Sequence, residues 1–198
     1  MKRLTHSFFN RKTALVAQEL LGKVLVCKNK DQIISGMIVE TEAYVGPQDL
    51  ASHASRGKTP RNEIMFGDAG YWYVYLIYGF YNCLNIVTEN KDYPSAVLIR
   101  AVEPLEGISL MEINRKTTKL ENLTSGPGKL CQAFGIDKKL NCLSCLDKDS
   151  ALFIADTGIT IPKNKIKKAK RVGVDYAGKW KDKLLRFYLK DNSFVSKK

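Results

Sequence analysis

The alternation of hydrophobic and polar residues predicts a chain built mainly from β-strands. Short runs rich in β-branched and aromatic residues, bounded by turn residues, are typical of strands. Such runs lie at residues 23–28, 32–44, 95–102, 151–156, 170–174 and 184–190. A polar turn at residues 29–31 is expected to join the first two, and residues 71–89 predict a β-hairpin with its tip near Tyr78 and Gly79.

Three segments have the composition of short helices. They lie at residues 13–22, 105–114 and 127–135. Thr13 is expected to be the N-cap of the first helix, and Gly22 suits the position after its end. Pro127 fits the start of the third helix and Gly135 its end.

Residues 46–70 interrupt this pattern with a stretch rich in Gly, Ser, Pro and charged residues. A connection of this length inside a compact domain is usually functional. No repeat, low-complexity tract or linker divides the chain. We therefore expect a single α+β (mixed α/β) domain over residues 1–198, with a frayed tail at residues 196–198.

Glu40, Glu42 and Tyr44 fall on one face of their predicted strand, because successive side chains point to opposite faces. Two carboxylates on one face permit acid–base catalysis when desolvation shifts one of them towards the working pH. A solvated strand face explains the same pattern, and the pattern alone favours it because exposed glutamates are common. Arg100 lies in an apolar strand and needs a carboxylate partner, with Glu42 and Glu103 as candidates.

The predicted hairpin is rich in tyrosine. Tyr73 and Tyr75 share a strand face, whereas Tyr78 lies beside the turn residue Gly79. Burial in the core explains most of these side chains, since tyrosine favours strands. A tyrosine at an exposed tip is the exception, because it can stack on a base or insert between base pairs.

The net charge of the chain indicates which class of partner it binds. The chain has 32 Lys and Arg against 20 Asp and Glu, a net charge of +12, and its pI is near 9.5. Such a surface attracts polyanions. The sequence shows no signal peptide and no apolar run of membrane-spanning length. We therefore expect a soluble intracellular protein, in the cytoplasm or nucleoid if bacterial, that binds nucleic acid rather than lipid.

Two basic segments are candidate phosphate contacts, with solvated charged surface as the alternative. They comprise Lys163, Lys165, Lys167, Lys168, Lys170 and Arg171, and Arg56, Lys58 and Arg61. The only histidines are His6 and His53, and Cys142 and Cys145 have no second pair of ligands, so no metal site is expected. Five cysteines also exclude a fully paired disulfide framework.

Six stretches together resemble the alkyladenine (3-methyladenine) DNA glycosylase family, the N-methylpurine glycosylases. They run in order along nearly the whole chain as LLGKVLV, IVETEAYVGPQDLASHASRGKTPRN, MFGDAGYWYVYLIYGFYNCLNIVTE, AVLIRAVEPLEG, LTSGPGKLCQAFGI and RVGVDYAGKWKDKLLRFYL. The resemblance implies a mixed α/β domain around a curved antiparallel sheet with a protruding hairpin. It also implies that damaged purines, alkylated or deaminated, are hydrolysed from double-stranded DNA without metal or cofactor, leaving an abasic site.

The resemblance assigns catalytic roles by position. Glu42 matches the base that activates water, and Arg100 matches an arginine that helps to hold this water. The backbone carbonyl of Val174 matches a further water ligand. Periodicity alone does not separate Glu40 from Glu42, so this choice is implied by the resemblance. A monomer is expected.

Five further positions match residues that handle the flipped base. Tyr44 and Tyr75 match the aromatic walls that stack on it, and His53 matches a residue that lines the pocket. Asn85 matches a residue at the pocket edge that helps to exclude normal guanine. Tyr78 matches the side chain that intercalates into the DNA stack.

Three other functions fit parts of the pattern. A bifunctional glycosylase/lyase would use a lysine as nucleophile, and a non-catalytic nucleic-acid-binding module would explain the charge and the tyrosines. A hydrolase acting on RNA or free nucleotides is the third. The residues do not rank 3-methyladenine, 7-methylguanine, hypoxanthine and ethenoadenine as substrates.

Overall fold

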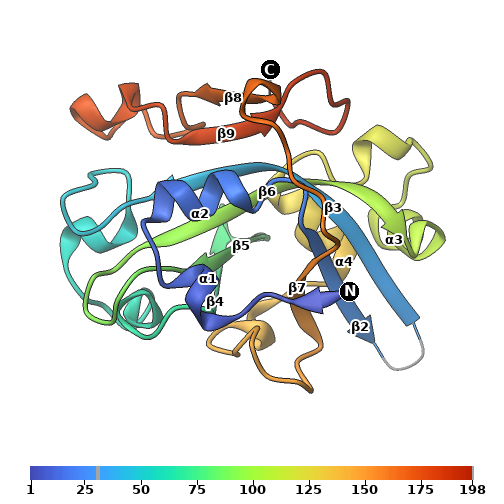
Figure 1. Cartoon of the computed structure of the whole chain (residues 1–198), viewed down its shortest axis with the longest axis horizontal. Helices are drawn as coiled ribbons and strands as arrows, with labels where there is room; N and C mark the ends of the chain where they lie inside the picture. Colours follow the sequence, from blue (N-terminus) through green and yellow to red (C-terminus); the bar gives the residue numbers. More distant parts are fainter. Residues whose placement is uncertain (30–31, 198) are drawn as a thin grey trace.

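The computed structural model describes residues 1–29 and 32–197. Its strands form one curled antiparallel sheet in the order β1-β7-β2-β3-β6-β5-β4, with β9 paired to β3 and β8 paired to β9 (Figure 1). The strands are β1 (Lys2–Arg3), β2 (Val24–Asn29), β3 (Gln32–Tyr44), β4 (Trp72–Ile77), β5 (Tyr81–Val87), β6 (Ala96–Glu106), β7 (Leu152–Asp156), β8 (Ile166–Ala169) and β9 (Arg186–Leu189). Together with its helices, this sheet confirms the predicted α+β fold.

The long strand β3 organises the sheet. β6 pairs along one of its edges, while β2 pairs with its first half and β9 with its second half along the other. The register between β3 and β6 shifts on both sides of Glu40, which is typical of a β-bulge. Glu40 and Glu42 both contact Arg100 of β6, as expected for residues on one strand face.

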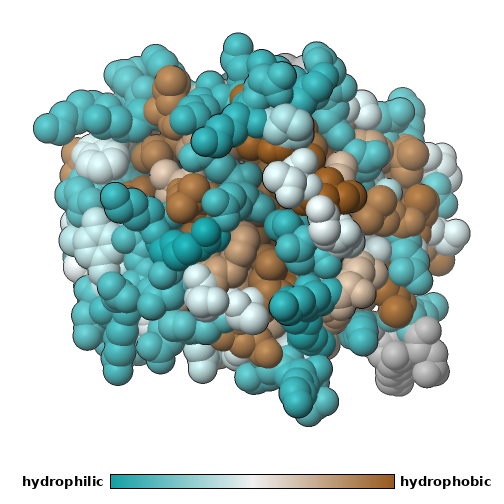
Figure 2. All heavy atoms as spheres, viewed as in Figure 1, coloured by the Kyte–Doolittle hydropathy of each residue, from teal (hydrophilic) through white to brown (hydrophobic). Residues whose placement is uncertain are grey.

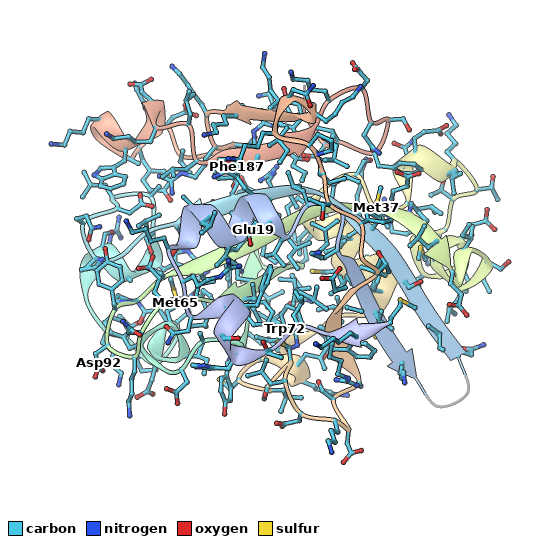
Figure 3. All side chains as sticks on the ribbon, viewed as in Figure 1. Glu19, Met37, Met65, Trp72, Asp92 and Phe187 are labelled. Carbon is cyan, nitrogen blue, oxygen red and sulfur yellow. The ribbon has the colours of Figure 1, made fainter. Side chains whose placement is uncertain are left out.

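Short helices cover the sheet. The α-helices are α1 (His6–Phe9), α2 (Thr13–Glu19), α3 (Ile108–Arg115) and α4 (Pro127–Phe134). The 3₁₀ helices are η1 (His53–Arg56), η2 (Glu63–Phe66), η3 (Leu120–Asn122), η4 (Lys138–Leu140), η5 (Lys163–Lys165) and η6 (Gly178–Asp182). α2 packs against β3 and β6, and α4 packs against β5, β6 and α3. Trp72 and Phe187, labelled below and above α2 in Figure 3, belong to the same buried cluster, which is the main part of the core.

Two predicted helix starts are wrong. Lys12 is the N-cap of α2, and Thr13 lies inside its first turn. Thr13 does not cap because its N–H and its hydroxyl both donate to Glu89 of a distant loop. The helix expected from residue 105 begins at Ile108, because β6 continues to the residue before Gly107, which turns the chain with φ 78°.

The strand predicted at residues 170–174 is also wrong, since the strand β8 ends just before it. Val172 donates its N–H to Glu42 instead of to a neighbouring strand. Gly173 has a φ of 75°, which an extended strand does not accommodate. This segment is therefore a loop, joined to β3 by the hydrogen bond from the Val172 N–H to the Glu42 side chain.

Within the tail expected to be frayed, the N–H of Ser196 donates to Glu40 at 2.7 Å and the carbonyl of Lys197 accepts from Arg186. Lys198 and residues 30–31 of the predicted turn lie outside the described residues. Over the described part of the chain, no helix is long and apolar enough to cross a membrane.

Candidate active site

One cavity of about 400 Å³ gathers six of the seven side chains predicted to form the site. The six are Tyr44, His53, Tyr75, Tyr78, Asn85 and Arg100. They come from β3, η1, β4, the hairpin tip, β5 and β6, so the curl of the sheet brings distant segments together. Met65, labelled at the left of Figure 3, also lines the cavity.

Glu42, the seventh residue, is fully buried behind the cavity wall. Its Oε1 accepts the N–H of Val172 at 2.8 Å, and its Oε2 accepts the hydroxyl of Tyr44 at 2.9 Å. Nη1 of Arg100 lies 3.3 Å from the same Oε2. All three partners line the cavity, so the Glu42 carboxylate lies directly at the back of its wall. The interpretation of these glutamates as a solvated strand face is wrong.

Arg100 lies between the two carboxylates of β3. Its Nε is 3.2 Å from Glu40, and neither glutamate side chain is exposed. Burial acts to lower the pKa of Arg100, but Glu42 and Glu40 outweigh it and the pKa is raised. The other predicted partner, Glu103, accepts from Asn192 instead. A permanent cation therefore borders the cavity next to Glu42.

Three rings of the cavity pack against one another. The ring centroids of His53 and Tyr75 are 4.6 Å apart in an edge-on arrangement, and those of Tyr73 and Tyr75 are 5.0 Å apart. Nδ1 of His53 lies 2.8 Å from the hydroxyl of Tyr73. Burial, followed by the charges of Arg61 and Arg56, lowers the pKa of His53 from 6.5 to about 4. His53 is therefore neutral at neutral pH.

Asn85 presents an amide whose orientation is fixed by the backbone. Its Nδ2 donates to the carbonyls of Tyr73 and Cys83, at 3.2 and 3.4 Å. No donor in the described residues binds its Oδ1. This acceptor is therefore available to a molecule in the cavity.

Tyr78 occupies the tip of the hairpin between β4 and β5, as predicted. Its side chain is 79% exposed, and its φ is 53°. Gly79 follows with a φ of 81°. Two consecutive residues of positive φ make a tight turn, which leaves the Tyr78 ring in solvent at the edge of the cavity.

A buried ion pair beside Tyr44 was not predicted. Arg171 binds both carboxylate oxygens of Asp49, at 2.5 and 2.8 Å, and neither side chain is exposed. The Arg171 guanidinium also lies 4.8 Å from the centre of the Tyr44 ring. Its assignment to a phosphate-binding cluster is therefore wrong. Sequence carried no signal for this pair, because its members are 122 residues apart.

The other basic residues of the two predicted segments are exposed. Figure 2 shows mainly hydrophilic side chains along the top of the molecule, where Figure 1 places β8 and β9. In the other segment, Arg61 lines the cavity with its guanidinium 5.1 Å from the ring centre of Tyr75. That segment thus reaches the rim of the site. Sequence reasoning placed Arg61 only among phosphate contacts.

A model of the family described as Methylpurine-DNA glycosylase (MPG) matches residues 7–193. The chain belongs to this family. Membership confirms the resemblance and makes the chain a DNA glycosylase, a hydrolase of N-glycosidic bonds in DNA. It excludes the non-catalytic binding module considered above.

Relatives match this chain over 99–100% of its length. A protein of Clostridium novyi (strain NT) is 49% identical over 207 residues, covering 100% of both chains. One of Legionella pneumophila (strain Lens) is 48% identical over 201 residues, with the same coverage. One of Clostridium perfringens (strain 13 / Type A) is 47% identical over 205 residues, 99% of this chain and 100% of its own. All three carry the provisional name 3-methyladenine DNA glycosylase.

The site is a cavity lined by five tyrosines together with Ser52, His53, Arg61, Asn85 and Arg100. Concave pockets of about this volume bind small organic groups. A few polar atoms at fixed positions in such a pocket set the orientation of the bound group. Within residues 1–29 and 32–197, no three His, Cys, Asp or Glu side chains gather in a way that could hold a metal ion. Arg100, His53 and several tyrosines line the cavity, and Glu42 lies directly behind its wall.

Proposed function

We propose that this enzyme flips an alkylated or deaminated purine out of duplex DNA and hydrolyses its N-glycosidic bond with a water activated by Glu42. One observation carries the proposal: the buried Glu42 carboxylate lies beside the cation of Arg100 at the wall of an aromatic cavity. A carboxylate has about four acceptor positions. Val172, Tyr44 and Arg100 use three of them, which leaves one for a water.

Aromatic side chains bind the flipped base. Tyr44 and Tyr75 stack on its two faces, and their electron-rich rings favour cationic or electron-poor purines. Neutral His53 and the free Oδ1 of Asn85 supply hydrogen-bonding groups at its edge, which is where flipped bases are distinguished. Because stacking contributes most of the contact, one pocket accepts several lesions.

Hydrolysis replaces the bond from C1′ to the purine nitrogen with a bond from C1′ to the water oxygen. The electron pair of the broken bond leaves with the purine, and a proton of the water passes to Glu42. The nearby carboxylate also stabilises the positive charge that develops on the sugar. Arg100 and the Val174 carbonyl hold the water. This carbonyl accepts from Ala177 at 2.9 Å and keeps a second lone pair.

The exposed ring of Tyr78 enters the DNA stack at the position that the flipped nucleotide leaves. Its place on a tight turn at the rim of the cavity supports this role. A single chain supplies every group named above, so we propose that the enzyme acts as a monomer.

The variant Glu42→Gln tests the proposed base. Glutamine has nearly the same shape but does not accept a proton from the water. We expect the variant to bind a hypoxanthine-containing duplex like the wild type and to lose excision by about 10²–10⁴-fold, the usual contribution of a general base. Abasic sites are counted after alkaline cleavage of the labelled strand, under single-turnover conditions and with a check that the variant is folded.

Undiminished excision by Glu42→Gln would show that another group activates the water. Trapping of a covalent enzyme–DNA adduct by borohydride would contradict hydrolysis and indicate a lysine nucleophile. An undamaged duplex of the same sequence is the control substrate.

A further inference from the structure

Glu40 binds three donors from three distant parts of the chain. Its Oε1 lies 3.2 Å from Nε of Arg100 and 2.8 Å from Nη1 of Arg186. Its Oε2 accepts the backbone N–H of Ser196 at 2.7 Å. The hydroxyl of Ser196 in turn accepts from Nη2 of Arg100 at 3.3 Å. Two of the three guanidinium nitrogens of Arg100 are therefore bound by groups other than Glu42.

Glu40 itself has no access to substrate. It is fully buried and does not line the cavity. The chain end that supplies Ser196 lies beside β8 and β9 (Figure 1). Phe194 and Val195, directly before Ser196, are each only 7% exposed and anchor this end in the core. The Glu40 network thus binds Nε and Nη2 of Arg100, while Nη1 faces Glu42.

We infer that Glu40 and Ser196 are positioning residues that hold Arg100 so that Nη1 alone reaches Glu42. The inference rests on the proposed roles of Glu42 and Arg100. An arginine that faces a carboxylate freely binds it with two parallel N–H groups. Arg100 without Glu40 is free to turn a second N–H towards Glu42. This second bond would occupy the acceptor position that remains for the water.

A double-mutant cycle between Glu40 and Arg100 tests this inference. We expect Glu40→Gln to lower the single-turnover excision rate by about 10²-fold, the cost of a displacement near 1 Å at a reacting group. The Kd for lesion-containing duplex should stay unchanged, because Glu40 does not touch DNA. In the Arg100→Gln background the same substitution should change the rate by less than about twofold, since residues that act through one another are not additive.

Ser196→Pro tests the same inference through a residue near the end of the chain, without a substitution in β3. Proline has no N–H for Glu40 to accept, so the variant should lose rate when Arg100 is present and not in the Arg100→Gln background. Lys197→Ala is the matched control. It changes the neighbouring exposed side chain but keeps the carbonyl that accepts from Arg186, so its rate should equal that of the wild type. These variants decide the question if Glu40→Gln does not fold.

If Glu40→Gln or Ser196→Pro lowers the excision rate by the same factor with and without Arg100, the inference is overturned. Such a result indicates a role in stability alone. Glu42→Gln is measured in the same assay. An inactive Glu42→Gln with an additive cycle refutes the positioning role and leaves the proposed function intact. An active Glu42→Gln refutes the proposed base, whatever the cycle shows.

Discussion

His53 is an uncharged group in a strongly basic protein. Burial is the main reason that its pKa falls to about 4, and Arg61 and Arg56 add charge repulsion. Its Nδ1 bonds with the hydroxyl of Tyr73, which leaves Nε2 for the edge of a base. A cationic imidazole would repel an alkylated purine that carries a positive charge. The neutral form therefore suits the lesions proposed for this cavity.

The same shift predicts how stability depends on pH. Between pH 6.5 and about 4 the unfolded chain binds a proton at His53 and the folded chain does not. The free energy of unfolding should therefore fall as the pH is lowered through this range, with no further contribution from His53 below about 4. His53→Asn removes this part of the pH dependence. Urea unfolding at several pH values between 7 and 4 measures it.

His6→Asn, which replaces an exposed histidine on α1, is the matched control for loss of an imidazole outside the cavity. If the stability curves of His53→Asn and wild type run parallel across this pH range, His53 is charged in the folded protein and the argument fails.

Glu40 and Glu42 show what residue patterns predict and what they omit. Strand alternation predicts correctly that both side chains share a face, since both contact Arg100. It does not predict burial, because most of the donors that permit burial come from distant segments: β6, β9, the loop at Val172 and the end of the chain. It also does not separate the two roles, which depend on Tyr44 for one glutamate and on Ser196 for the other.

At the scale of elements, hairpins and strand faces are predictable, whereas loops tied by long-range contacts are not. The tyrosine-rich hairpin forms as predicted because its pattern and turn residues are local. Residues 170–174 have a strand-like composition, yet Arg171 and Val172 bond to Asp49 and Glu42 instead of a neighbouring strand. These partners lie more than a hundred residues away, so no local pattern reports them.

The pair Asp49–Arg171 joins the loop after β3 to the loop that supplies the N–H of Val172. Asp49→Asn leaves Arg171 as a buried charge without its counter-ion. Breaking a buried pair in this way costs about 3–5 kcal/mol, so the variant should lose that much free energy of unfolding. Excision should fall as well, because the Val172 N–H that binds Glu42 loses its support. Urea unfolding and the excision assay measure the two effects.

Asp182→Asn is the control for this prediction, since the Lys170–Asp182 pair is exposed on both sides and should contribute little. A loss of stability in Asp49→Asn no larger than in Asp182→Asn would mean that the buried pair does not hold the two loops together.

At the scale of the whole molecule, the net charge of +12 predicts attraction to DNA of any sequence. The structure distinguishes buried, paired basic residues from exposed ones, which the sequence does not. Arg171 is buried in an ion pair, and Arg100 is held by carboxylates at the cavity wall. Arg56 is exposed at the end of η1, the element that carries His53, and has no ion-pair partner in the described part of the chain. It is the clearest candidate for a phosphate contact near the site.

Salt dependence of binding tests this assignment. Each phosphate contact contributes about 0.9 to the slope of log K against log salt concentration for duplex DNA. Arg56→Gln should therefore reduce the slope by about 0.9 with undamaged duplex, while excision at saturating enzyme stays close to wild type. Lys28→Gln removes the same charge from β2, on the opposite side of the molecule from η1 in Figure 1, and should leave the slope unchanged. Equal slopes for Arg56→Gln and wild type would mean that DNA does not cross the rim of the cavity at η1, and that the exposed lysines of β8 are the better candidates for the phosphate contacts.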